Sequence, residues 1–109
     1  MISYMEYTAV YKDLAEPDFA RSLFEAETLV DNWTAGRYKK AKGYKEEKVR
    51  RCLIKLIHEI GMPDYYKKGV KSASNDGYSE TYASDAEINA GYKAIAFAYL
   101  SGTGLLSYL

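Results

Sequence analysis

The sequence has few of the residues on which metal sites, disulfides and most catalytic centres depend. Its 109 residues include one cysteine, Cys52, and one histidine, His58. A single cysteine excludes an intrachain disulfide and favours a reducing compartment, and a single histidine excludes a histidine-based metal cluster. We expect His58 on the exposed side of its helix, and Cys52 at the edge of the core as a small apolar residue. The sequence therefore predicts neither an enzyme nor a cofactor or metal site.

Net charge and long apolar runs are also missing. Fifteen basic residues balance fifteen acidic ones, whereas a dedicated nucleic-acid-binding protein usually carries a strong basic excess. The longest apolar run, 94–100, is far shorter than the ~20 residues that cross a bilayer. The first residues lack the basic start and apolar stretch of a signal peptide. We expect one cytoplasmic domain over 1–109, without a membrane segment.

Helical periodicity is the main pattern that the sequence does contain. An acid-Pro-Asp start at 16–18 suits the first turn of a helix, which should end near Gly36. A second helix is predicted over 44–60, because the following residues 61–63 include a glycine and a proline. A third is predicted over 84–100, opened by a serine–glutamate capping box. The fold class is therefore mainly α, a compact three- to four-helix domain with one small β-hairpin before the last helix.

The segments between the helices carry weaker patterns. Residues 1–15 alternate over a short distance only, which predicts an extended or irregular N-terminal arm whose tyrosines pack on the helices. Segment 62–69 fits one more helical turn or a loop. A hairpin is predicted over 70–83, because the Asn-Asp-Gly run at 75–77 favours a tight turn. A lone two-stranded ribbon is marginally stable, so this hairpin should rest on the helices or on a neighbouring subunit.

The last predicted helix is apolar on every side. Phe97 points about 180° away from Ile88 at 100° per residue, and Lys93 is the only charge between Ile88 and Leu100. A helix of this composition needs burial on more than one side. We expect a partner subunit to cover the side that the small domain leaves open. The predicted core stripe of this helix comprises Ile88, Tyr92, Ile95 and Tyr99.

Large apolar residues off the core stripes also indicate assembly. Phe24, Ile54 and Phe97 each lie off the main stripe of their helix, and the chain has 12 tyrosines, a residue enriched at interfaces. A simpler interpretation is that isolated exposed apolar residues are ordinary and that tyrosine sits at the boundary of a small core. The predicted subunit interface comprises Phe24, Ile54, Tyr78, Tyr82, Phe97, Leu105 and Leu106.

One segment is strongly basic within the neutral chain. Residues 37–51 contain eight lysines and arginines against two glutamates. Phosphate contact is one interpretation, with Tyr38 and Tyr44 as stacking groups. The other is a solvated loop and helix start whose charge is balanced elsewhere on the surface. The candidate phosphate-contacting residues are Arg37, Lys39, Lys40, Lys42, Lys45 and Arg51.

Two stretches, supported by the order of the elements, carry a family resemblance. Trp33-Thr34-Ala35-Gly36-Arg37 follows the first helix, and Leu100-Ser101-Gly102-Thr103-Gly104-Leu105-Leu106 follows the last. Between them lies a stretch rich in serine and tyrosine, 72–82. With these features the chain resembles the small head–tail connector proteins of tailed bacteriophages, also called head-completion, adaptor or DNA-packaging proteins.

The resemblance implies a structural role without catalysis. Connector subunits form a ring, commonly of about a dozen copies, with head-to-tail interfaces. The ring docks under the portal protein of a filled head, extends the DNA channel without sequence-specific binding, and provides a surface for tail or stopper proteins. The implied location is the host cytoplasm during assembly and then the head–tail junction of the virion. We expect one interface patch around Phe97 and the other around Tyr78 and Tyr82. The alternative function is a small helical DNA-binding protein that uses segment 37–51.

Overall fold

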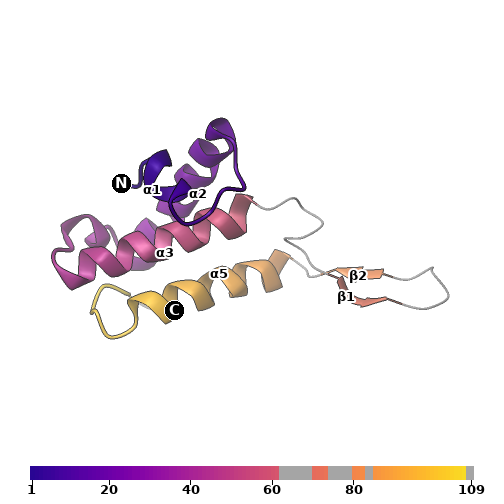
Figure 1. Ribbon diagram of the computed structural model, residues 1–109. Coiled ribbons are helices and arrows are strands. Elements are labelled where there is room, and N and C mark those ends of the chain that lie inside the picture. Colours follow the sequence, from indigo (N-terminus) through magenta and orange to yellow (C-terminus); the bar gives the residue numbers. More distant parts are fainter. Residues whose placement is uncertain (62–69, 74–79, 83–84, 108–109) are drawn as a thin grey trace.

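The computed structural model describes residues 1–61, 70–73, 80–82 and 85–107. The chain is mainly α-helical (Figure 1), as the sequence predicts. Within the described residues its elements are α1 Tyr4–Thr8, α2 Glu16–Thr34, the 3-10 turn η1 Arg37–Lys40, α3 Tyr44–Gly61, β1 Val70–Ala73, β2 Glu80–Tyr82 and α5 Asp85–Leu100.

Helix α3 lies at the centre of the helical body. In Figure 1, α1 and α2 lie on one side of it and α5 on the other, and α3 makes the main contacts with both α2 and α5. Its buried residues recur at the three- and four-residue spacing of one helical face. Cys52 is fully buried among them rather than at the core edge, which corrects the sequence-based expectation. The buried side chains of α3 are Val49, Cys52, Leu53, Leu56, Ile57 and Ile60.

Helix α2 is the amphipathic helix that its sequence predicts. Pro17 lies in its first turn, and the helix ends where Ala35 and Gly36 adopt left-handed backbone conformations, with φ of 52° and 77°. A left-handed backbone ends an α-helix, and glycine adopts it without a steric cost. Thr34 is buried, but its hydroxyl donates to the carbonyl of Val30 at 2.8 Å. Burial of this polar side chain is therefore compensated.

The N-terminal segment differs from its prediction as an extended or irregular arm. Residues 4–8 form α1, which begins with a capping box between Ser3 and Glu6. The sequence signals for this helix were the Ser-x-x-Glu spacing and the helical spacing of Tyr4, Tyr7 and Tyr11. The expected packing of tyrosines on the helices is confirmed. The rings of Tyr4 and Tyr7 lie 5.3 and 5.4 Å from the ring of Phe19, measured between centroids.

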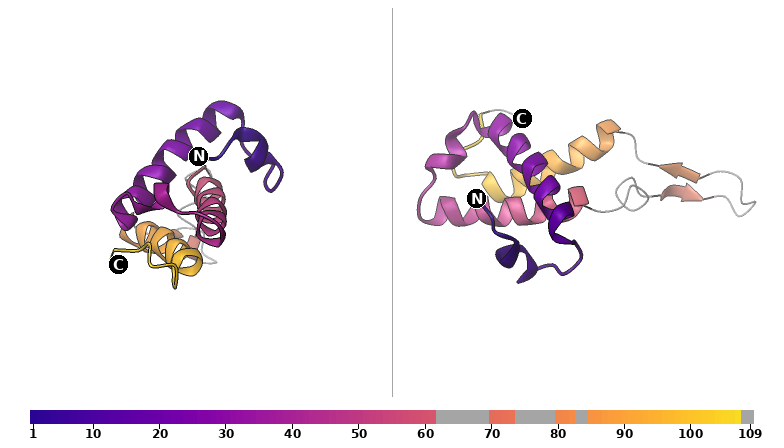
Figure 2. Two further views of the ribbon diagram at one scale, coloured as in Figure 1. Left: turned by 90° about the vertical axis from the view of Figure 1, so that its left-hand side faces the viewer. Right: turned by 90° about the horizontal axis from the view of Figure 1, so that it is seen from above.

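Strands β1 and β2 pair antiparallel, with Val70 opposite Tyr82. They fall inside the range predicted as a hairpin, and in Figures 1 and 2 the pair extends beyond the ends of α3 and α5. The predicted turn at 75–77 and the ambiguous segment 62–69 lie outside the described residues. The complete hairpin therefore stays a prediction.

Helix α5 has the predicted bounds, although Ser84 of its expected capping box lies outside the described residues. The centre of its buried face is rotated from the predicted stripe. Ala96 and Leu100 are fully buried. The four predicted residues are half-buried along one flank of this face: Ile88, Tyr92, Ile95 and Tyr99.

The C-terminal segment turns back towards α2. Gly102 adopts φ of 84°, which ends α5 as predicted, and the Thr103 hydroxyl donates to the Leu100 carbonyl at 2.6 Å. The backbone N–H of Ser107 then donates to the Trp33 carbonyl at 2.8 Å. This hydrogen bond places the C-terminal segment beside the end of α2.

Candidate functional site

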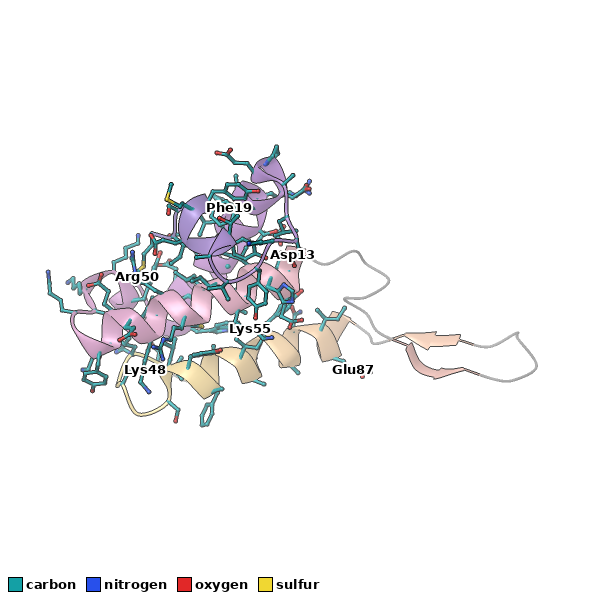
Figure 3. All side chains as sticks on the ribbon, viewed as in Figure 1. Asp13, Phe19, Lys48, Arg50, Lys55 and Glu87 are labelled. Atoms are coloured by element: carbon teal, nitrogen blue, oxygen red, sulfur yellow. The ribbon has the colours of Figure 1, made fainter. Side chains whose placement is uncertain are left out.

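A polar network joins the N-terminal segment to α3. Asp13 lies where this segment meets α3 (Figure 3). One of its carboxylate oxygens accepts from the Tyr7 hydroxyl at 2.7 Å, and the other lies 2.6 Å from Nδ1 of His58. The Tyr11 ring stacks on the His58 ring with 3.9 Å between centroids. The prediction that His58 is exposed is wrong, since its side chain is 17% exposed and paired.

This Tyr–Asp–His arrangement holds the segment in place. Burial, with the hydrogen bond to Asp13, raises the pKa of Tyr7 well above its usual range, so its hydroxyl stays protonated and donates. The carboxylate accepts from both neighbours and thereby links residues 7–13 to His58 of α3. The network is a structural latch, because both oxygens of Asp13 and the stacked face of His58 are already occupied by neighbours.

The described residues contain no group of three or more histidine, cysteine and acidic side chains that could hold a metal ion. Burial raises the pKa of the Cys52 thiol to about 12, so the thiolate needed for metal binding or nucleophilic attack does not form near neutral pH. None of the described helices combines the length and apolarity needed to cross a membrane.

Helix α5 presents an apolar face away from α3. Phe97 is 57% exposed, and the small residues on the same side of the helix are exposed with it. The charged neighbour of Phe97 on this face, one helical turn away, is Lys93, which has no ion-pair partner among the described residues. This exposed face comprises Ala90, Gly91, Lys93, Ala94, Phe97 and Ala98; we call it the outer face of α5.

A hollow of 290 Å³ lies between α2, the end of α3 and the start of α5. Phe24, which is 73% exposed, stands at this hollow with Leu29 and Tyr92. Glu25 contributes a carboxylate at its border and forms no ion pair with the described residues. We call this the α2–α5 hollow; its lining is Phe24, Glu25, Thr28, Leu29, Ile60, Asn89 and Tyr92.

The structure does not bring the predicted trio Phe24, Ile54 and Phe97 into one patch. Ile54 is half-buried and lines a different hollow, of 230 Å³, together with Val10 and Tyr99. Phe24 lies at the α2–α5 hollow, and Phe97 lies on the outer face of α5. The three residues therefore mark separate surfaces, which is the arrangement that a head-to-tail contact requires and a single two-fold contact does not.

The remaining predicted interface residues divide into three cases. Leu105 is 7% exposed and belongs to the core of the monomer, so it is not a surface residue as predicted. Leu106 is half-buried against that core. Tyr82 is described only as a paired strand residue, and Tyr78 lies outside the described residues.

The arginines of the basic segment make intramolecular contacts. The Arg37 guanidinium donates to the Leu105 carbonyl at 3.0 Å and to the Ser107 hydroxyl at 2.9 Å. Arg50 pairs with Glu6 at 2.8 Å, and Arg51 pairs with Glu47 at 2.7 Å; Figure 3 shows Arg50 near α1. The Arg37 contacts tie the C-terminal segment to the helical body and the Arg50 pair ties α1 to it, whereas the Arg51 pair lies within α3.

The lysines of this segment lie differently. Lys39, Lys40 and Lys42 are exposed, and Lys45 is half-buried. Tyr38 is buried, so the interpretation of its ring as a stacking platform is wrong, whereas Tyr44 is exposed. Burial is the main cause that raises the pKa of the Tyr38 hydroxyl, and the nearby carboxylates of Glu27 and Asp31 raise it further.

An open groove of 560 Å³ adjoins these lysines. One wall is the 37–45 segment and the other is the turn after α5. We call it the basic groove; its lining is Arg37, Lys40, Ala41, Lys42, Tyr44, Lys45, Thr103, Gly104 and Leu105. Sequence reasoning identified the cations of this groove but not its second wall.

Searches for similar proteins add no assignment: the chain matches no family model, no curated protein and no solved structure.

Proposed function

We propose that the chain is a structural subunit that assembles head to tail into a ring of the phage head–tail connector type. The ring, of about twelve copies, would dock under a portal protein, extend the DNA channel and provide a surface for a tail or stopper protein at the head–tail junction of the virion. The single observation that carries this proposal is the outer face of α5. It exposes a phenylalanine among small residues on a helix that already buries its opposite face.

The relative positions of Phe97 and the α2–α5 hollow support a head-to-tail contact. Tyr92 of α5 lines the hollow, and Phe97 is five residues further along, which places it about 140° around the helix axis. A subunit therefore cannot fill its own hollow with its own Phe97. When a second copy fills it, the same two patches remain open at the ends of the pair, so addition continues until a ring closes or a filament forms.

Charge complementarity favours the same contact between the outer face of α5 of one copy and the α2–α5 hollow of the next. Lys93 lies one turn from Phe97 on the outer face of α5, and Glu25 lies beside Phe24 at the hollow. When Phe97 of one copy enters the hollow of the next, its Lys93 faces that border. A copy facing itself through a two-fold axis would instead bring two outer faces of α5 together, with like charges opposed.

The predicted hairpin supplies a second surface in this proposal. Strands β1 and β2 extend past the helical body in Figure 1, and a two-stranded ribbon gains stability by packing on something else. We assign its Tyr78 and Tyr82 to a contact with the adjacent subunit or with the portal. This role requires no catalytic residue.

The experiment that tests the proposed function measures particle mass by light scattering over a wide concentration series, with electron microscopy of the most concentrated sample. We expect closed rings from the unmodified protein and monomers from Phe97→Glu. Met5→Glu is the matched control, because Met5 is an exposed apolar residue of α1 away from both patches; its rings should persist. A protein that stays monomeric at every concentration, alone and with its portal, would rule out the ring.

A further inference from the structure

The basic groove is a strongly charged surface that subunit assembly does not use. Four cationic side chains line it, Arg37, Lys40, Lys42 and Lys45, and its lining residues include no acid. The three lysines form no ion pair with any residue in the described part of the chain. Their charges are therefore not neutralised by an ion pair within the described residues, although Lys42 also lines a neighbouring hollow that contains Glu27 and Glu46.

The distribution of charge changes across the 37–45 segment. The hollow on its other side, of 280 Å³, contains the carboxylates of Glu27 and Glu46 among its basic residues. Lys39 lines that hollow and lies over the Tyr38 ring, 5.9 Å from its centroid. Adjacent lysines of one short turn thus face different environments: Lys39 lies beside acids, and Lys40 lines the basic groove.

Two structural features fix the shape of the groove. The hydrogen bonds from Arg37 to the Leu105 carbonyl and the Ser107 hydroxyl hold the turn after α5 against the basic segment. Helix α3 begins at the groove, where its first backbone bond runs from the Glu47 N–H to the Gly43 carbonyl at 3.2 Å. The N–H groups of Tyr44 and Lys45 precede that bond and add the positive end of the helix dipole to the lysine charges.

We infer that the basic groove binds the phosphodiester backbone of double-stranded DNA. Lysines on a flexible stem act as point charges for phosphate oxygens, and such contacts carry no sequence information. The duplex is favoured over a single strand because single-strand binding depends on aromatic stacking platforms. The fold buries Tyr38 and leaves Tyr44 as the aromatic residue of the groove lining. This site goes beyond the proposed ring, since a monomer already contains the whole groove.

The test measures binding of a fluorescent 20-base-pair duplex by anisotropy, in the Phe97→Glu background so that assembly does not contribute. Contacts from three lysines give a slope of log K against log salt of about −2.7, so affinity should fall about 40-fold between 50 and 200 mM salt. The groove variant Lys40→Gln/Lys45→Gln should lower the slope to about −0.9 and weaken binding more than tenfold at 50 mM salt.

The matched control is Lys12→Gln/Lys39→Gln, which removes the same charge from exposed lysines outside the groove lining. It should keep nearly all of the affinity, and circular dichroism should be the same for all variants. Equal losses in the two double variants would overturn the inference, as would the absence of salt-dependent binding.

Competing ligands separate the sources of phosphate. We expect a single-stranded 20-mer to bind more weakly than the duplex, and inorganic phosphate to compete only at millimolar concentration. Tighter binding of the single strand, or saturation by inorganic phosphate alone at micromolar concentration, would overturn the assignment to duplex DNA. Because the measurement uses a monomeric variant, a positive result stands even if rings never form, and a negative result leaves the ring proposal intact.

Discussion

Helices α2 and α5 both pack on the central helix α3, but their outer faces differ. Away from α3, α2 exposes Arg21, Glu25, Thr28 and Asn32, with Phe24 as its large apolar exception. The outer face of α5 instead exposes alanines, a glycine and Phe97. The polar side chains of the first set are stable at a solvent-exposed surface, whereas the second set gains free energy only when another protein surface covers it.

The comparison shows why burial in the monomer and apolarity of the sequence must be considered separately. On α2 the apolar stripe and the buried stripe largely coincide. On α5 the apolar residues surround the helix while α3 covers only the side of Ala96 and Leu100. The fold of the monomer does not account for the apolar residues on the outer face of α5. In our proposal, assembly buries them.

The largest expected effect separates the two faces of α5. Leu100→Ala should lower the free energy of unfolding by about 2–5 kcal/mol, because Leu100 is fully buried and leaves a cavity. Phe97→Ala should change it by less than about 0.5 kcal/mol but abolish assembly, since surface substitutions rarely affect monomer stability. Urea unfolding at low protein concentration measures the free energy of unfolding of both variants, and light scattering measures assembly. A large loss with Phe97→Ala would show that this ring is part of the monomer core.

Alkaline pH should destabilise the α1–α3 side of the molecule. Below pH 9 the Cys52 thiol is protonated in both the folded and unfolded states; above pH 9, its usual pKa, the unfolded thiol ionises, whereas the folded thiol stays protonated up to about pH 12. Stability should therefore fall as pH rises from 9 to 12, by up to about 1.4 kcal/mol per pH unit. The raised pKa of Tyr7 adds to this loss above pH 10.

Urea titrations between pH 8 and 11 measure this dependence. Cys52→Ala should be less stable at pH 8 because of the cavity it leaves, but its stability should fall less steeply with pH. Identical slopes for the two proteins would contradict the assignment of the alkaline loss to Cys52.

The latch at Asp13 provides a smaller effect on the same side. Asp13→Ala should lower the free energy of unfolding by about 1–3 kcal/mol, because it leaves the buried Tyr7 hydroxyl without its acceptor. Asp18→Ala is the matched control; it removes a carboxylate whose ion pair with Arg21 is exposed, and should cost less than about 1 kcal/mol. Amide exchange should increase in residues 4–11 but remain unchanged in α5. Equal losses in the two variants would contradict the latch.

The smallest expected effect concerns the proposed pairing of Lys93 with Glu25. Lys93→Glu should weaken assembly two- to fivefold, since an exposed ion pair contributes about 0.2–1 kcal/mol. Adding Glu25→Lys should restore it, because the reversed charges are again opposite. A double-mutant cycle on the concentration for half-maximal assembly measures this coupling. If the losses of assembly from the two single substitutions simply add in the double variant, Lys93 does not face Glu25 and the proposed register of the contact is wrong.

Much of the helical fold could be predicted from local sequence, because capping, periodicity and helix-ending residues act within a few positions. This holds for the bounds of α2, α3 and α5. The α1 helix was not predicted, although its capping box lies in the sequence, because the short alternation of Tyr7, Ala9 and Tyr11 favours an extended segment. The position of Ala96 at the centre of the buried face depends on how closely α5 approaches α3, which periodicity alone does not give.

The candidate sites were less predictable, since they depend on residues far apart in the chain. Arg37 and Leu105 are separated by 68 positions, yet their hydrogen bond forms the basic groove. His58 was predicted to be exposed because it lies opposite the apolar stripe of its own helix, and helical periodicity does not identify a partner, Asp13, that lies 45 positions away. Residue type identified the charges and the aromatic rings correctly, but tertiary contacts decide which of them remain open to a ligand or a neighbour.

Disulfide trapping between two variants that each carry one added cysteine is the sharpest test of the head-to-tail contact. Glu25→Cys and Lys93→Cys introduce one accessible thiol each, and the native Cys52 is fully buried and does not react. We expect mild oxidation to give cross-linked dimers when the two proteins are mixed, and none from either protein alone, because residue 93 of one copy faces residue 25 of the next in the proposed contact. Dimers from Lys93→Cys alone, or no cross-linking in the mixture at concentrations where the unmodified protein assembles, would contradict it.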